Sequence, residues 1–207
     1  MRPHLIHRVP FILALLVLSL IPHEMGATTI LDTGSITFTA SGLQFGRLTR
    51  DGIPSDWASP KSFPGVIGAP ATRAYDLFTV NAGPYPYLQV LLDDPAVALF
   101  ASAYLGAYTP ANAPPNFGLN VNYLGDAGFS QILDNPSFFQ IVVNPFANVL
   151  IPINEVNPGG GAGAQFSLLV EGFYDTNYSE TPEPASLALV ATGAALLAAI
   201  RRRTRSV

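Results

Sequence analysis

The sequence predicts an all-β fold for the central body of this chain, an antiparallel β-sandwich of jelly-roll type spanning residues 28–174. Short apolar stretches with a period of two recur along the body, and Pro or Gly clusters bound nearly all of them. No long amphipathic helix pattern occurs between these stretches. Several short strands with frequent turns are typical of two packed antiparallel sheets.

The first candidate strand, Ser35–Ser41, shows the period most clearly, because Ile36, Phe38 and Ala40 alternate with threonines. Residues 51–74 are rich in Gly, Pro, Ser and Asp, and we expect a long loop or edge excursion there. The other candidate strands are Leu43–Arg50, Tyr75–Ala82, Tyr87–Asp93, Val97–Leu105, Phe138–Asn144, Val149–Glu155 and Gln165–Phe173.

Of these candidates, Val97–Leu105 has the composition closest to a helix, because alanine favours helices. We nevertheless predict a strand, since Leu99, Ala101 and Ala103 alternate with larger or polar residues and a glycine ends the stretch.

Residues 1–27 have the three parts of a secretory signal peptide. A basic start precedes the apolar run Val9–Ile21, and a less hydrophobic stretch comes after it. We expect cleavage between Ala27 and Thr28. The alternative is an uncleaved N-terminal anchor, although the apolar run is short for a membrane span.

Residues 175–181 are predicted to form a linker to a distinct C-terminal segment, residues 182–207. The segment begins with Pro182, Glu183 and Pro184. Prolines cannot donate backbone hydrogen bonds and push the preceding residue towards extended conformations, so we expect a stiff, helix-free entry to residues 185–200.

Residues 185–200 contain no charged residue and are rich in Ala and Leu, which predicts a single transmembrane helix. As a helix they would span about 24 Å, which is short against a hydrocarbon core of about 30 Å and makes a marginal permanent anchor. A basic cluster then ends the segment, made of Arg201, Arg202, Arg203 and Arg205. Such a cluster favours the cytoplasmic side, which places the body outside.

This tail resembles the PEP-CTERM sorting signal of exported bacterial proteins, in which a Pro-Glu-Pro motif, a transmembrane segment and a basic tip lie at the C-terminus. The resemblance implies that Pro182, Glu183 and Pro184 are recognised by an exosortase, a membrane enzyme with a cysteine nucleophile. It also implies a protein held at the inner membrane in transit and then delivered to the cell surface or beyond. An ordinary C-terminal membrane anchor is the alternative.

Charge and composition exclude several function classes. Residues 28–180 hold four basic residues against twelve acids, a formal charge of −8, so we expect no nucleic-acid partner. The chain has no cysteine, and its three histidines precede residue 28. After cleavage the body therefore lacks the residues for Ser-His-Asp or Cys-His catalysis and for ordinary zinc or copper sites.

The body is also similar to pre-peptidase C-terminal (PPC) domains, a β-sandwich module of exported bacterial proteins. The similarity covers about residues 73–173 and is carried by Tyr75–Val80, Phe100–Gly106, Asn122–Gly128 and Asn154–Gly159. It implies an accessory or adhesive module. Some relatives have cysteine pairs that this chain lacks, and function does not follow from a sandwich fold alone.

Two oxygen-rich turns are candidate calcium sites, because calcium binds six to eight oxygen ligands in loops of this kind. They contribute Asp93, Asp94 and Asp126. Asp and Asn are also common in turns for backbone reasons, and neither stretch has the acidic spacing of an EF-hand. We expect no other cofactor.

Two further motifs favour structural interpretations. Leu31–Ser35 matches the Asp-Thr-Gly-Ser signature of aspartic proteases, but a second Asp-Thr-Gly is missing and a homodimer would have to supply it. A turn that joins two short strands explains Asp32 better. Pro158–Gly163 is glycine-rich but lacks the Lys-Ser/Thr of a phosphate loop, which favours a hairpin connection.

We therefore expect an exported, non-catalytic cell-surface or extracellular-matrix protein. The resemblance of its tail to PEP-CTERM signals implies an association with exopolysaccharide or biofilm. The first alternative is a carbohydrate-binding module that uses calcium or an aromatic platform. Its candidate aromatic residues are Tyr85, Tyr87, Tyr104, Tyr108, Phe117, Tyr123, Phe138 and Phe139. The second alternative is a hydrolase with paired carboxylates.

Overall fold

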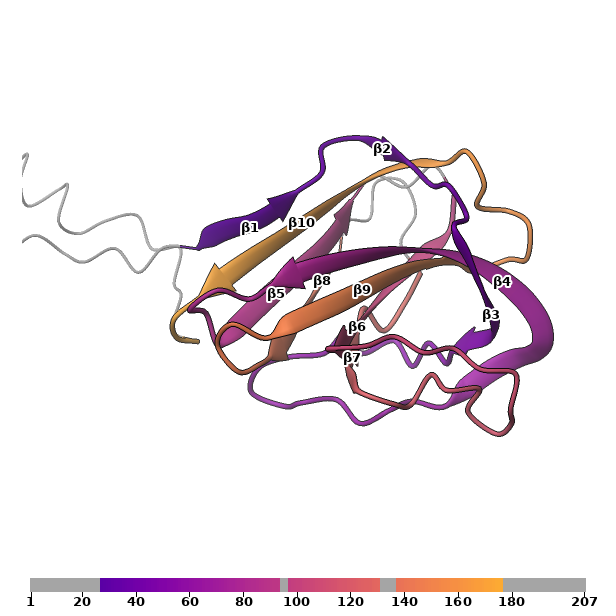
Figure 1. Ribbon diagram of the computed structural model, residues 1–207, viewed down its shortest axis with the longest axis horizontal. Coiled ribbons are helices and arrows are strands. Elements are labelled where there is room, and N and C mark those ends of the chain that lie inside the picture. The colour runs from indigo at the N-terminus through magenta and orange to yellow at the C-terminus, as the bar shows by residue number, and fades with distance from the viewer. Residues whose placement is uncertain (1–26, 94–96, 131–136, 177–207) are drawn as a thin grey trace, which may run out of the picture. The chain divides into compact units, whose positions relative to one another are not determined.

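The computed structural model describes residues 27–93, 97–130 and 137–176, which form an all-β body of ten strands without an α-helix (Figure 1). Every strand pairing in this part of the chain is antiparallel. No helix among the described residues is long and apolar enough to cross a membrane. Most of the predicted signal peptide, the sorting segment 182–207 and Asp94 lie outside the described residues.

The first sheet has the strand order β1-β10-β5-β8, with β2 paired to β10. Its strands are β1 (Thr28–Asp32), β2 (Ile36–Thr37), β5 (Tyr87–Asp93), β8 (Ser137–Val142) and β10 (Gln165–Phe173). The second sheet has the order β3-β4-β9-β6-β7. Its strands are β3 (Gly42–Leu48), β4 (Val66–Asn81), β6 (Leu99–Leu105), β7 (Tyr123–Asp126) and β9 (Asn148–Glu155).

The two sheets share one hydrophobic core, because alternate residues of their strands point to the same side. In β5 the core residues are Leu88, Val90 and Leu92, all fully buried. Contact between the sheets is direct, since the Phe78 ring of β4 meets the Phe166 ring of β10 edge to face with centroids 6.0 Å apart. Burial of each such side chain stabilises the fold by about 1.5–3 kcal/mol.

Two predicted strands are confirmed residue for residue. Tyr87–Asp93 and Gln165–Phe173 are β5 and β10 with the predicted bounds, and the helix-like stretch Val97–Leu105 contains strand β6. Of Ser35–Ser41, only Ile36–Thr37 is a strand.

The prediction of a loop over residues 51–74 is wrong for its last part, because β4 begins at Val66. In the sequence, Gly68 and Pro70 indicate an interrupted strand. In the structure they lie opposite a register shift in β3. The first half of β4 pairs with β3 alone, because the pairing of β4 with β9 begins only at Tyr75. A strand without a second neighbour tolerates proline.

Strand β7 was not predicted, because it lies within a stretch interpreted as an oxygen-rich turn. Strands β1 and β2 flank the turn at Asp32, in agreement with the interpretation of this motif as a turn between two short strands. In β7, a Cβ on Gly125 would come within 2.5 Å of the Ser55 hydroxyl, so the glycine marks a close approach within a strand.

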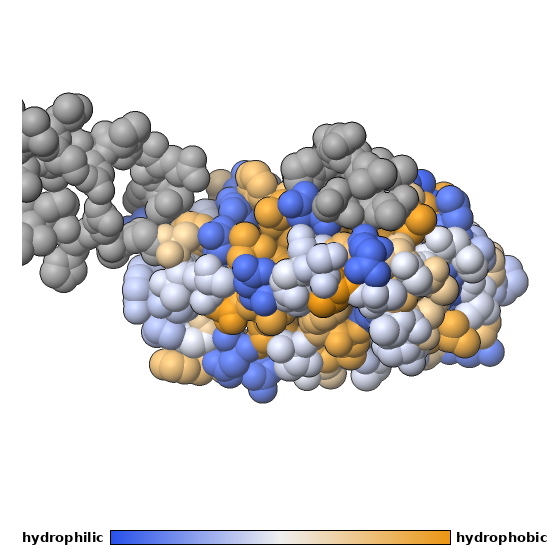
Figure 2. Space-filling model, turned by 90° about the horizontal axis from the view of Figure 1, so that it is seen from above, coloured by the Kyte–Doolittle hydropathy of each residue, from blue (hydrophilic) through white to orange (hydrophobic). Residues whose placement is uncertain are grey.

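Polar and apolar residues are mixed on the surface of the body. Figure 2 shows orange apolar patches among blue polar residues, and large apolar side chains such as Phe138 and Phe146 are exposed. Scattered exposed apolar residues are normal on protein surfaces, so their exposure alone does not mark a binding face.

Candidate functional site

Two connections cover the side of the second sheet that faces away from the first. We call residues 49–65, between β3 and β4, the clip segment, and residues 106–122, between β6 and β7, the cover loop. In Figure 1 both run below β6 and β7, whereas β1 and β10 lie above. Phe100, Ser102 and Tyr104 alternate with the core residues of β6, yet they are at most 2% exposed. The covered side is therefore a second buried layer.

Ser55 of the clip segment joins the edge strands of the two sheets. Its amide donates to the Asp126 carbonyl of β7 (2.9 Å), and its hydroxyl accepts from the Asp126 amide (2.8 Å). Its carbonyl accepts from the Gln140 amide of β8 (2.9 Å). The clip segment thus closes the seam between β7 and β8 at one residue.

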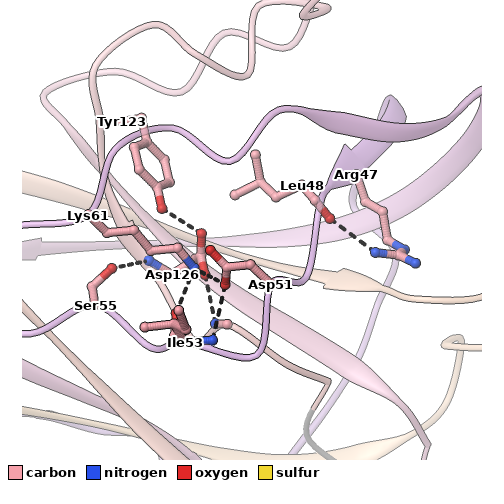
Figure 3. Close-up of polar contacts among 9 residues, drawn as sticks. Arg47, Leu48, Asp51, Ile53, Ser55, Lys61, Tyr123 and Asp126 are labelled. Carbon is pink, nitrogen blue, oxygen red and sulfur yellow. Dashed lines mark hydrogen bonds and ion pairs between the residues drawn. The ribbon is translucent and has the colours of Figure 1, made fainter.

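Lys61, also in the clip segment, is the only lysine in the sequence. Its Nζ donates to Asp51 Oδ1, the Ile53 carbonyl and Asp126 Oδ1, each at 2.7 Å (Figure 3). The side chain is 8% exposed, and that of Asp126 is 0% exposed. A sole lysine is therefore held in a buried ion pair with a residue 65 positions away.

Asp126 has further partners that fix both carboxylate oxygens. The Tyr123 hydroxyl donates to Oδ2, and the Gly128 amide donates to Oδ1 at 2.7 Å. Burial, and then the charge of Asp126, raise the pKa of Tyr123, so this hydroxyl keeps its proton. Asp126 is thus held in one orientation from three sides.

Asp51 is the more exposed acid of this cluster, with 36% of its side chain accessible. Partial burial opposes its ionisation, but hydrogen bonds from Lys61 and the Ile53 amide outweigh this and lower the pKa of the carboxyl. At neutral pH Asp51 is a carboxylate in contact with Lys61.

The candidate calcium ligands lie in different surroundings. Asp93 ends β5, Asp94 lies outside the described residues, and Asp126 is already paired with Lys61. Among the residues that the structure describes, no group of three or more His, Cys, Asp or Glu side chains could hold a metal ion.

Two other buried acids also serve the backbone. Asp76 accepts from the amides of Thr39 (2.6 Å) and Ser41 (2.9 Å), and these bonds lower its pKa although burial acts in the opposite direction. Glu155 accepts from the amides of Gly159 and Gly161, which organises the glycine-rich hairpin connection.

The aspartic protease motif forms a local turn in this structure. The Asp32 carboxylate accepts from the amide of Gly34, two residues on, at 2.9 Å. Gly34 has a φ of 56°, which glycine adopts without strain.

The outer side of the first sheet is open and carries an amide row. Gln140 Nε2 donates to Gln89 Oε1 (2.9 Å), and Gln89 Nε2 donates to Glu171 Oε2 (3.3 Å), across β8, β5 and β10. On one side of the row, Trp57 contacts Tyr87, which lies two positions before Gln89 on β5, with ring centroids 5.7 Å apart. On the other side lies Phe138, which is paired with Leu91 and is 51% exposed.

The aromatic candidates divide between the two sides. Tyr104, Tyr108 and Tyr123 form a series of ring contacts in the covered layer, and Phe139 is in the core. Tyr87 and Phe138 remain on the open side of the first sheet.

The similarity to known proteins concerns the C-terminal tail, where residues 180–203 match the PEP-CTERM protein-sorting motif. The chain carries this sorting motif. It includes Pro182, Glu183 and Pro184, and it implies an exported protein that passes through the membrane, is processed by an exosortase and ends at the cell surface. No curated protein matches the chain.

The sequence singled out Asp126 but not its partner. The available signal was that Lys61 is the only lysine in the sequence. No local sequence pattern indicates that the clip segment contacts β7.

Proposed function

We propose that this is a non-catalytic cell-surface or extracellular-matrix protein, sorted by an exosortase that recognises Pro182, Glu183 and Pro184. The match of residues 180–203 to the PEP-CTERM motif is the observation that carries the proposal. In this proposal the tail anchors the protein in the inner membrane, with Arg201, Arg202, Arg203 and Arg205 on the cytoplasmic side, until processing. Signal-peptide cleavage between Ala27 and Thr28 precedes this step.

Mass spectrometry of the mature protein from the host that exports it tests the sorting step. We expect a C-terminus truncated near the motif in the native protein, and an uncut or mislocalised form in Glu183→Ala. Asp175→Ala is the matched control, since it removes an acid of the linker outside the matched residues 180–203. A tail intact through Val207 in the native protein would contradict the proposal.

We also infer that the body is a jelly roll. When β2 and β3 are left aside, eight strands remain, four in each sheet. If these eight strands are numbered 1 to 8 along the chain, their spatial order is 1-8-3-6 in the first sheet and 2-7-4-5 in the second. Each sheet thus interleaves early and late strands, as two Greek keys wound into a double sheet require. The similarity to PPC domains over residues 73–173 remains a prediction.

A second proposal concerns the ligand: the open side of the first sheet binds a neutral exopolysaccharide strand. The row of Gln140, Gln89 and Glu171 offers planar hydrogen-bonding groups to sugar hydroxyls. Rings on both sides of the row, those of Tyr87 and Phe138, offer apolar faces to sugar rings. A body of negative charge disfavours an anionic polymer.

Retention of the full-length chain on immobilised exopolysaccharide from its own host tests this second proposal. Gln89→Ala with Gln140→Ala should abolish retention. The matched control is Asn81→Ala with Asn148→Ala, an amide pair on the second sheet with a 2.9 Å hydrogen bond. Equal retention of both double variants would overturn the proposal, and loss of retention in a chelator would assign the binding to calcium instead.

A further inference from the structure

We propose that Lys61 and Asp126 condense into an intramolecular isopeptide bond between Nζ and Cγ. The proposal rests on the body alone and is independent of the sorting tail and of the polysaccharide face. Its starting point is the contact between a buried amine and a buried carboxyl group, 2.7 Å apart from Nζ to Oδ1 (Figure 3).

The two reacting groups are held in place before any reaction. Nζ is fixed by the Ile53 carbonyl and by Asp51, and the carboxyl group of Asp126 is fixed by Tyr123 and Gly128. Holding two groups in reactive contact replaces a bimolecular step with a unimolecular one and removes much of its entropic barrier.

The reaction begins with a proton transfer within the pair. Moving one proton from the ammonium to the Asp126 carboxylate gives a neutral amine and a neutral acid without any exchange with solvent. Little solvent reaches the two groups, since their side chains are only 8% and 0% exposed. The neutral amine is the nucleophile.

The surrounding groups accept and return the proton that the condensation moves. As the Nζ–Cγ bond forms, the Asp51 carboxylate takes one proton from Nζ, and negative charge develops on Oδ2, where the Tyr123 hydroxyl donates. Asp51 then protonates the Oδ1 hydroxyl, the Cγ–Oδ1 bond breaks, and water leaves. The products are an amide, one water molecule and the original Asp51 carboxylate, and no oxidant or reductant is needed.

The crosslink would join the clip segment to β7, the edge strand that this segment covers. It closes a chain segment of 65 residues between its two ends. Closing a long segment lowers the entropy of the unfolded chain, as a disulfide does. An exported protein without cysteine would gain a covalent restraint that reducing agents do not break.

The sole lysine makes the test direct. The exported protein is purified, its two termini are determined, and it is denatured and treated with an amine-specific reagent. We expect a single label at the N-terminal amine, an intact mass one water below the value calculated between those termini, and no tryptic cleavage after Lys61. A full sequence mass together with labelling of Lys61 would overturn the proposal.

Variants distinguish a covalent bond between Lys61 and Asp126 from an ion pair between them. Asp126→Ala should restore the full mass and expose Lys61 to the reagent in the denatured chain. Asp51→Asn keeps the side-chain shape but removes the proton acceptor, so unreacted chains should accumulate. Asp56→Asn, at an exposed acid of the same segment, is the control and should react fully. Should a variant fail to fold, the mass and labelling of the native chain still decide.

Discussion

The outer sides of the two sheets differ in what covers them. On the second sheet, Tyr104 and Asp126 lie beneath the clip segment and the cover loop and are at most 1% exposed. On the first sheet, Phe138 and Val142 are 51% and 43% exposed. The two longest described connections therefore cover the second sheet. The first sheet is covered at one end, where Trp57 of the clip segment packs on Tyr87 and Phe173, and it is open around Phe138 and Val142.

This difference explains where each kind of chemistry is found. On the covered side, ionisable groups meet one another without water, so their interactions are strong and each partner is fixed. On the open side, neutral amides and partly exposed rings predominate, and these can exchange water for a ligand. The covered side thus suits restraint within the chain, and the open side suits binding.

The largest effect should come from breaking the buried pair on the covered side. Asp126→Ala removes both the buried ion pair with Lys61 and the crosslink proposed between these residues, and we expect a loss of about 3–5 kcal/mol or more in unfolding free energy. Urea unfolding measures it. Asp56→Ala, on an exposed acid of the clip segment, should cost less than about 1 kcal/mol. Similar losses in both variants would show that coverage does not strengthen the pair.

A smaller effect is expected from alkaline pH. Burial raises the pKa of Tyr104, Tyr108 and Tyr123 above the ordinary value. Below about pH 10 the tyrosines are neutral in both states, so stability is retained; above it the unfolded chain ionises first, and stability falls as pH rises. Urea unfolding at increasing pH should show this, and Tyr104→Phe should reduce the slope.

Acid should act through Asp76, which is buried against the connection between β2 and β3. Its pKa is lowered by the amides of Thr39 and Ser41. The unfolded chain therefore takes up the proton first, at about pH 4, and the contribution of Asp76 is lost as pH falls through its folded pKa. Asp76→Asn should be less stable at neutral pH and less sensitive to acid. A variant with an unchanged acid profile would assign the sensitivity to other groups.

The smallest effect belongs to the open side. Gln89→Ala removes two side-chain hydrogen bonds from a half-buried position, and we expect a loss of about 0.5–1 kcal/mol. Thermal unfolding without ligand measures it. A loss as large as that of Asp126→Ala would remove the contrast between the two sides.

The strands that the sequence predicted are those whose pattern is visible within a few neighbouring residues. β5 and β10 were predicted with their bounds, since strict alternation is visible within seven to nine residues. The first half of β4 was missed because its Gly68 and Pro70 are tolerated only through a register shift in another strand. No local pattern reports a shift of this kind.

The candidate site was predicted in a similar way. Asp126 stood out as an oxygen ligand in a turn, but its surroundings come from Lys61, Ser55 and Tyr123. Of these, only Tyr123 is near in sequence. The clip segment has no periodic pattern that would place its lysine over β7, so this contact is set by tertiary packing.

The connection to the sorting tail has a mechanical consequence. The chain leaves the body from β10, which is hydrogen-bonded to β1 on one side and to β5 on the other. A force along the tail therefore acts on β10 along its own direction and shears its hydrogen bonds to both neighbours at once. A force on an edge strand would break the hydrogen bonds to a single neighbour one after another. A body held by this tail would therefore take up load at a strand of the first sheet that has a hydrogen-bonded neighbour on each side.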